Sequence, residues 1–149
     1  MVAIGRAFAP FLLKELIEQP SEKLVLKAIE QKEAIGLKGQ ATPREINLFY
    51  IKKGLRERIV EENGVYQVLN TDLTFTKAEI IAEVENSPEH FSPNVIIRPL
   101  FQEVILPNLA YIGGGGELAY WMERQEQFAH FGVNFPMLIR RNSAVWIDK

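Results

Sequence analysis

Four consecutive glycines are the feature of this sequence best suited to bind a ligand: Gly113, Gly114, Gly115 and Gly116. They follow a short apolar run (109–112) and precede a segment with helical periodicity (117–131). Glycines let the backbone approach a ligand closely, and the helix after them presents free N–H groups and the positive end of its dipole. The join therefore predicts a phosphate or carboxylate site. It would equally allow a tight turn with close helix–strand packing, and the motif alone leaves both interpretations open.

Polar side chains from three short stretches could line such a site. With the four glycines, the candidate nucleotide- and substrate-binding residues are Asn94, Arg98, Gln102, Glu117, Tyr120, Arg141 and Asn142. Arg98 and Gln102 lie four positions apart and would share a helical face. An arginine in a cleft can hold a carboxylate or phosphate bidentately. A salt bridge to Glu103 or Glu117 explains Arg98 at least as well. Without other evidence, a polar turn with two solvated arginines is the preferred interpretation of Arg140 and Arg141.

Several kinds of chemistry lack their motifs. Neither GxGxxG nor GxxxxGK[ST] occurs, and without a P-loop lysine we exclude a Walker-type NTPase. The absence of cysteine excludes disulfides and thiolate chemistry. His90 and His130 have no spacing to other ligands that suits a metal, so we expect no metal site. No catalytic residue can be assigned from a GxSxG elbow or a triad.

Composition narrows the class of protein and its partners. The chain has 149 residues, 47% hydrophobic and 24% charged, with a net charge of −2. This mixture is typical of a globular protein, and it lacks the basic footprint of a nucleic-acid binder. No apolar run approaches the roughly 20 residues that a membrane helix needs. We expect a cytoplasmic protein with neither a nucleic-acid nor a membrane partner.

The elements that must position the glycines follow the order helix, strand, glycine loop, helix, strand. We expect a helix over 95–106, strands over 109–112, 135–139 and 144–147, and a helix over 117–131. Pro99 is tolerable only in the first turn, so the first helix should start near Ile97. The strand–loop–helix–strand order is that of a βαβ unit, whose ligands bind beyond the carboxyl ends of the strands.

The residues before 89 predict a different arrangement. Two helices, 6–18 and 21–36, should form a hairpin, with Pro20 ending the first and Ser21 capping the second. Strands are expected over 46–51, 55–62 and 65–69, with a type I′ turn at Asn63-Gly64. Thr76 to Glu79 forms a capping box that opens a helix ending before Pro88. We expect a helical hairpin followed by a small antiparallel sheet with a helix.

Two long runs carry a family resemblance. They are Ser92-Pro93-Asn94-Val95-Ile96-Ile97-Arg98-Pro99-Leu100-Phe101-Gln102-Glu103 and Leu106-Pro107-Asn108-Leu109-Ala110-Tyr111-Ile112-Gly113-Gly114-Gly115-Gly116-Glu117-Leu118-Ala119-Tyr120-Trp121. Both are similar to the signature stretch of the BshC family, the cysteine-adding enzymes of bacillithiol synthesis. Segments 43–50, 128–132, 135–137 and 141–143 also resemble that family, so the likeness spans nearly the whole chain.

The resemblance implies a mixed α/β fold with a partial Rossmann-like core, similar to class I aminoacyl-tRNA synthetases, at 92–149. Residues 1–88 would form a connecting insertion, and residues 89–149 the second half of the core. The implied activity is addition of L-cysteine to glucosaminyl-malate, with ATP activating a carboxylate that the amine of the amino sugar then attacks.

The enzymes of this family are several times longer than this chain. The first half of the nucleotide fold and the dimerising coiled coil have no counterpart here. We therefore expect a fragment with little or no ligase activity alone, whose uncovered apolar faces favour a homo-oligomer. The alternative from another class is a non-catalytic α+β interaction module with a purely structural glycine loop.

Overall fold

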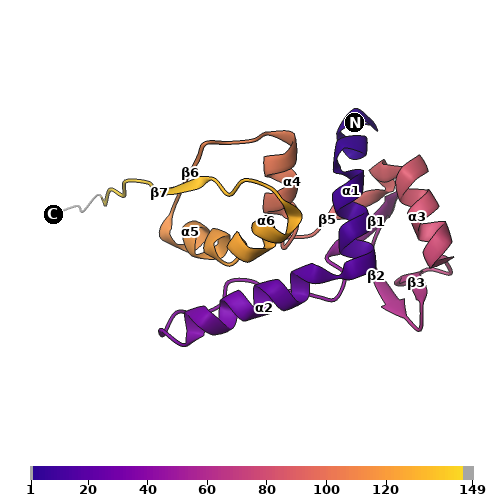
Figure 1. The fold of residues 1–149 in the computed structure, drawn as a ribbon, viewed down its shortest axis with the longest axis horizontal. Helices are drawn as coiled ribbons and strands as arrows, with labels where there is room; N and C mark the ends of the chain where they lie inside the picture. The colour runs from indigo at the N-terminus through magenta and orange to yellow at the C-terminus, as the bar shows by residue number, and fades with distance from the viewer. Residues whose placement is uncertain (1, 146–149) are drawn as a thin grey trace.

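The computed structural model of the chain describes residues 2–145, and its elements mix helices with strands as predicted. In chain order they are α1 (Val2–Glu18), α2 (Pro20–Glu33), β1 (Leu48–Lys52), β2 (Leu55–Glu62), β3 (Val65–Val68), β4 (Thr74–Thr76), α3 (Lys77–Asn86), the 3-10 turn η1 (Pro88–His90), β5 (Phe91–Pro93), α4 (Arg98–Ile105), β6 (Ala110–Gly113), α5 (Gly115–Met122), α6 (Gln125–Phe131) and β7 (Met137–Arg140). Figure 1 shows α1, β1, β2, β3 and α3 on one side and β6, β7 and α4 to α6 on the other, with α2 running from the end of α1 along the lower edge of the second group. None of the described helices is both long enough and apolar enough to span a bilayer.

The larger sheet is antiparallel, with strand order β4-β3-β2-β1-β5. Two local sequence signals, a turn and a helix cap, help to form this sheet and the helix that follows it. Asn63 and Gly64 have φ angles of 53° and 81°, which confirms the predicted turn between β2 and β3. The Thr76 hydroxyl accepts from the Glu79 amide, and the Glu79 carboxylate accepts from the Thr76 amide, so the predicted capping box is present.

Two helices cover one face of this sheet, and the main core lies between them and the strands. Tyr50 and Ile59 point into it from neighbouring strands, and both are buried. The core residues are Phe8, Leu12, Leu16, Ile46, Leu48, Tyr50, Ile59, Tyr66, Val68, Ile80, Val84, Phe91 and Ile97. The helical residues of this core come from α1 and α3, which cover one face of the sheet. Side chains on the opposite face of the strands do not enter this core.

The second sheet is the predicted βαβ unit. β6 and β7 pair in parallel, from Ala110 opposite Met137 to Gly113 opposite Arg140. Leu100, Trp121, Phe128 and Phe131 form its core. The carboxyl ends of both strands therefore lie together, next to the start of α5.

The helix predicted over 117–131 is wrong in two respects. It begins earlier, at Gly115, and it is interrupted after Met122, so that α6 starts at Gln125. The interruption buries the side chains of Glu123 and Arg124. One Glu123 oxygen accepts from the Lys32 ammonium at 2.6 Å and from the Gln40 amide at 2.9 Å. These contacts come from distant parts of the chain, so helical periodicity could not indicate them.

The predicted hairpin of the first two helices is also not formed. Gln19 is left-handed, with φ of 50°, and Pro20 occupies the first turn of α2. The chain therefore turns a corner, and α2 leaves α1 to lie beside α6 (Figure 1). Ser21 does not cap α2, because its hydroxyl donates to Glu15 at 2.6 Å. Of the strand predicted over 144–147, residues 144 and 145 have no regular structure and the rest lies outside the described residues.

Two salt bridges fasten α2 to the α5–α6 segment, and they differ in burial. The Lys32 ammonium lies 2.6 Å from the Glu123 carboxylate, with side chains only 10% and 0% exposed. It also donates to the Ala119 carbonyl at 3.0 Å. The Lys27–Glu126 pair, at 3.1 Å, is 58% and 38% exposed. A buried charge that loses its partner is costly, whereas an exposed pair contributes little.

We expect Lys32→Met to lower the free energy of unfolding by about 3 kcal/mol, because the buried Glu123 carboxylate then keeps only its longer ion pair with Arg124, at 3.7 Å. Lys27→Met is the matched control and should cost less than about 1 kcal/mol. Urea unfolding of the two variants measures the difference. The double variant Lys32→Met, Glu123→Gln should recover part of the loss, and equal effects of the two single variants would contradict the role of burial.

Glu15 of α1 has a buried carboxyl group, and its hydrogen bonds connect the antiparallel sheet with the βαβ unit. It accepts from Ser21, from the Asn47 amide at 3.2 Å and from the Asn47 side chain at 2.9 Å. Ser21 in turn accepts from Gln127 of α6 at 2.7 Å. Asn47 also accepts from Asn94 at 3.0 Å. Burial raises the pKa of Glu15 from its ordinary 4.5 to about 7, although these hydrogen bonds favour the ionised form.

This pKa predicts how stability depends on pH. Between about pH 4.5 and 7 the folded chain holds a proton on Glu15 that the unfolded chain has released, so stability falls as the pH rises through this window. The contribution of this group should be on the order of 3 kcal/mol and fully lost above pH 7. Comparing urea unfolding of the wild type and Glu15→Gln from pH 5 to 8 tests it. Parallel pH profiles for the two proteins would refute the assignment.

Candidate functional site

The four glycines join β6 to α5, and they serve two different purposes. A Cβ added at Gly113 would lie 2.8 Å from the Tyr111 ring and 3.2 Å from Cβ of Glu117. At Gly114 it would lie 3.2 Å from Nη2 of Arg141. Around Gly115 and Gly116 no neighbouring atom of residues 2–145 lies within 4 Å of such a Cβ. Packing therefore explains Gly113, whereas the neighbours of Gly114 are the ends of exposed side chains. The last two glycines are exposed.

Backbone amides at this helix start are the groups that an anion would use. The Gly114 amide is already taken, because it donates to the Glu117 carboxylate at 2.7 Å. The first helical bond runs from the Leu118 amide to the Gly114 carbonyl at 2.9 Å. The amides of Gly115, Gly116 and Glu117 precede that bond and have no intrahelical acceptor. Glu117, predicted as a ligand-binding residue, acts here as an internal cap.

Arg141 is the predicted side chain that the structure brings to the loop. Its amide donates to the Gly113 carbonyl at 2.9 Å, which continues the parallel ladder one residue past β7. Its guanidinium lies beside Gly114, close to the position that a side chain there would occupy. Asn142 follows it and is exposed. The carboxyl ends of the two strands thus place a cation next to the glycine amides.

Other predicted residues make contacts away from this loop. Asn94 accepts from the Ile96 amide at 2.8 Å, at the start of α4, and donates to Asn47. Tyr120 donates its hydroxyl to the Val95 carbonyl. Burial raises the pKa of Tyr120, although the nearby Arg124 charge opposes this shift.

Arg98 and Gln102 do not contribute to the crevice expected around the glycines. They share the outer face of α4, as their spacing predicted, and line a pocket there with Phe101, Ile105, Leu106 and Asn108. That pocket contains no residue of the glycine loop. Glu103, which neighbours Gln102, points inward instead and binds the Asn108 amide at 2.8 Å.

Two polar clusters were not indicated by the sequence. Arg124 is fully buried, with its guanidinium 4.6 Å from the Tyr120 ring centre, on a helix face that periodicity assigns to solvent. The second cluster ties α3 to β1: Glu83 accepts from the Tyr50 hydroxyl at 2.6 Å and lies 2.7 Å from Nδ1 of His90. Burial would raise the pKa of Glu83, but these hydrogen bonds and the nearby cations lower it. No motif spacing relates the three residues, so only the fold reveals them.

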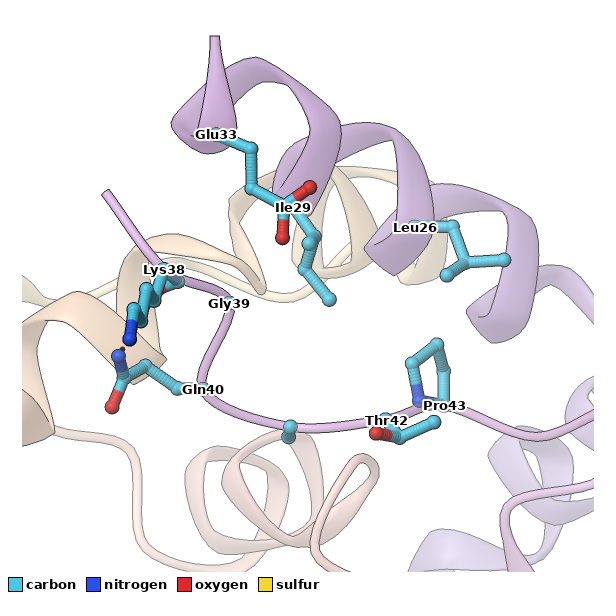
Figure 2. A pocket seen from close by; sticks show the side chains of 9 residues that line it. Leu26, Ile29, Glu33, Lys38, Gly39, Gln40, Thr42 and Pro43 are labelled. Carbon is cyan, nitrogen blue, oxygen red and sulfur yellow. Dashed lines mark hydrogen bonds between the residues drawn. The ribbon is translucent and has the colours of Figure 1, made fainter. Parts of the chain in front are cut away.

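A pocket of about 560 Å³ lies between α2 and segment 38–43. Figure 2 shows Leu26 and Ile29 facing this space from the helix, with Pro43 across from them on the loop. Gly39 passes so close that an added Cβ would lie 2.8 Å from Cγ2 of Ile29. None of the predicted site residues lines this pocket.

A parallel strand, a glycine loop, a helical crossover and a second parallel strand define a Rossmann-like α/β chain, with its candidate site at the strand ends. The chain belongs to the BshC family: the family model described as "Bacillithiol biosynthesis BshC, N-terminal Rossmann-like domain" matches residues 2–142. The resemblance noted in the sequence is therefore confirmed.

Curated relatives carry the name of a candidate cysteine ligase, BshC. The protein of Flavobacterium psychrophilum is 53% identical over 147 residues, which cover 99% of this chain and 27% of that protein. The relative from Flavobacterium johnsoniae is 54% identical over 142 residues, covering 95% and 26%. The one from Cytophaga hutchinsonii is 43% identical over 139 residues, covering 93% and 27%. This chain spans about a quarter of the length of these relatives.

The glycine loop itself gives a test by substitution. Gly113→Ala should lower the free energy of unfolding by about 1 to 3 kcal/mol, because its Cβ would overlap the Tyr111 ring and the next helix. Gly115→Ala is the matched control and should be neutral or slightly stabilising, since it fills open space at a helical position. Thermal unfolding compares the two. Similar losses in both would show that the loop tolerates no side chain for another reason.

Proposed function

We propose that this chain forms part of a cytoplasmic ligase that adds L-cysteine to glucosaminyl-malate in bacillithiol biosynthesis. The supporting observation is the meeting of the glycine loop with Arg141 at the carboxyl ends of two parallel strands, in a member of the BshC family. ATP is the proposed cosubstrate that activates the carboxylate. The amine of the amino sugar then attacks the activated carbonyl, an amide bond forms, and the activating group leaves.

The loop's part in this reaction is to hold an anionic group. The amides of Gly115 and Gly116 point beyond the helix start, where the helix dipole favours negative charge. The Arg141 guanidinium adds a formal positive charge and a forked donor that suits a phosphate or carboxylate. Glu117 already occupies the Gly114 amide, so a second anion is best held on the Gly115 and Gly116 side.

This chain supplies one wall of such a site. Gly115, Gly116, Glu117 and Arg141 are all exposed. Ligation requires nucleotide, carboxylate and amine to be held in one geometry, and most of the rate gain comes from that positioning. An open wall can bind one anionic group but cannot exclude water or align three reactants. We therefore expect little or no ligase activity from this chain alone.

Titration of the purified, isotopically labelled chain with ATP, and separately with glucosaminyl-malate, tests the proposal. We expect amide chemical-shift changes at 114–118 and 141 with at least one of them. Arg141→Gln should weaken this binding about ten-fold, the value of one charge-assisted hydrogen bond. Arg140→Gln makes the same charge change one residue earlier and should have little effect. A loop that does not respond to either compound would refute the proposed anion site.

A further inference from the structure

A second cationic site lies on the antiparallel sheet, where three arginines surround one pocket. The pocket measures about 380 Å³, and it is lined by Thr42, Arg44, Ile46, Leu48, Phe49, Arg56, Arg58, Asn94 and Val95. No acidic residue is among them. In a chain whose net charge is −2, three cations around one hollow are a local excess of positive charge.

Strand register explains how two of these arginines meet. Phe49 of β1 lies opposite Arg58 of β2, and Ile51 lies opposite Arg56. Side chains alternate along a strand, so these residues share the sheet face opposite Tyr50 and Ile59, which enter the core under α1 and α3. The two arginines therefore point away from the helices. The loop before β1 brings Arg44 to the same hollow.

Part of this site is already arranged for a ligand. The Arg56 guanidinium carbon lies 3.7 Å from the centre of the Phe49 ring, so the cation packs against this ring. None of the three guanidinium groups lies within salt-bridge distance of a carboxylate in residues 2–145. The backbone groups of Arg44 exchange hydrogen bonds with the Asn47 side chain. Three like charges around one concavity repel each other until an anion neutralises them.

We propose that this arginine pocket binds a small organic oxyanion, a phosphate or carboxylate group with two or more negative charges, through residues separate from those of the glycine loop. Its volume falls in the range of small-molecule sites. Its walls combine donors with the apolar side chains of Phe49 and Val95, which suits a compact ligand with an anionic end and a carbon skeleton. Planar guanidinium forks match both phosphate and carboxylate oxygens.

Pyrophosphate and malate are the probes that separate the two sources of charge. Each is titrated into the labelled chain at fixed ionic strength, and amide shifts are followed at 44, 56–58, 94 and 95. A response to pyrophosphate alone supports a phosphate-bearing ligand, and a response to malate alone supports a dicarboxylate. A response to both supports a general oxyanion site, and no response to either overturns the proposal.

Variants show whether the binding belongs to the pocket. Arg44→Gln and Arg58→Gln should each weaken the bound probe about ten-fold or more. Lys53→Gln, in the exposed turn of the same hairpin, makes the same change in net charge and should alter affinity less than two-fold. Equal losses in all three would show diffuse attraction and overturn the proposal.

Two controls separate lost binding at the arginine pocket from unfolding and from effects of the glycine loop. Removing one of three like charges should leave the melting temperature of Arg44→Gln unchanged or raised, so lost binding cannot be attributed to unfolding. Arg141→Gln should leave binding at the arginine pocket unaltered, because that residue belongs to the glycine loop. A failure of the glycine-loop proposal would therefore leave this one standing, and a loss of pocket binding in Arg141→Gln would overturn the proposal that the two sites use separate residues.

Discussion

One chain of buried hydrogen bonds holds the two sheets of this molecule in a fixed relation. It runs from Gln127 on α6 through Ser21 on α2 and Glu15 on α1 to Asn47 before β1, and ends at Asn94 before α4. Polar groups in an interior are costly unless their partners are placed correctly, so each link constrains the next. This series of hydrogen bonds fixes how the glycine loop and the arginine pocket are placed relative to each other. The turn at Gln19 and the direction of α2 therefore affect both sites.

Local signals in the sequence were sufficient for much of the fold. The Asn63-Gly64 turn, the Thr76 capping box and the Pro99 helix start depend on residues within one turn of each other, and all were predictable. The break between α5 and α6 was not. It depends on Lys32, which reaches Glu123 across 91 positions of sequence, and no periodicity in a single helix encodes such a partner.

The candidate site divides in the same way. Arg141 could be placed beside the glycines because parallel strands bring their carboxyl ends to one edge. Asn94 and Tyr120 have the right polarity for ligand contact, but their side chains form hydrogen bonds with Asn47 and Val95, which are distant in the sequence. The arginine pocket could not be predicted, because Arg44, Arg56 and Arg58 come together only through the strand register and the loop before β1. Residue type indicates what a side chain can do, and the fold decides whether it is free to do so.

The hydrogen bond from Tyr120 to Val95 has a consequence for how the two sites would communicate. Tyr120 belongs to the helix that the glycines open, and Val95 forms part of the rim of the arginine pocket. A ligand that shifts this helix must therefore also displace the rim, or break that bond. If a ligand at one site changes the affinity of the other site, the second ligand changes the affinity of the first site by the same factor, because linkage between binding equilibria is reciprocal. Tyr120→Phe would remove the tie and leave both sets of ligand-contacting groups in place.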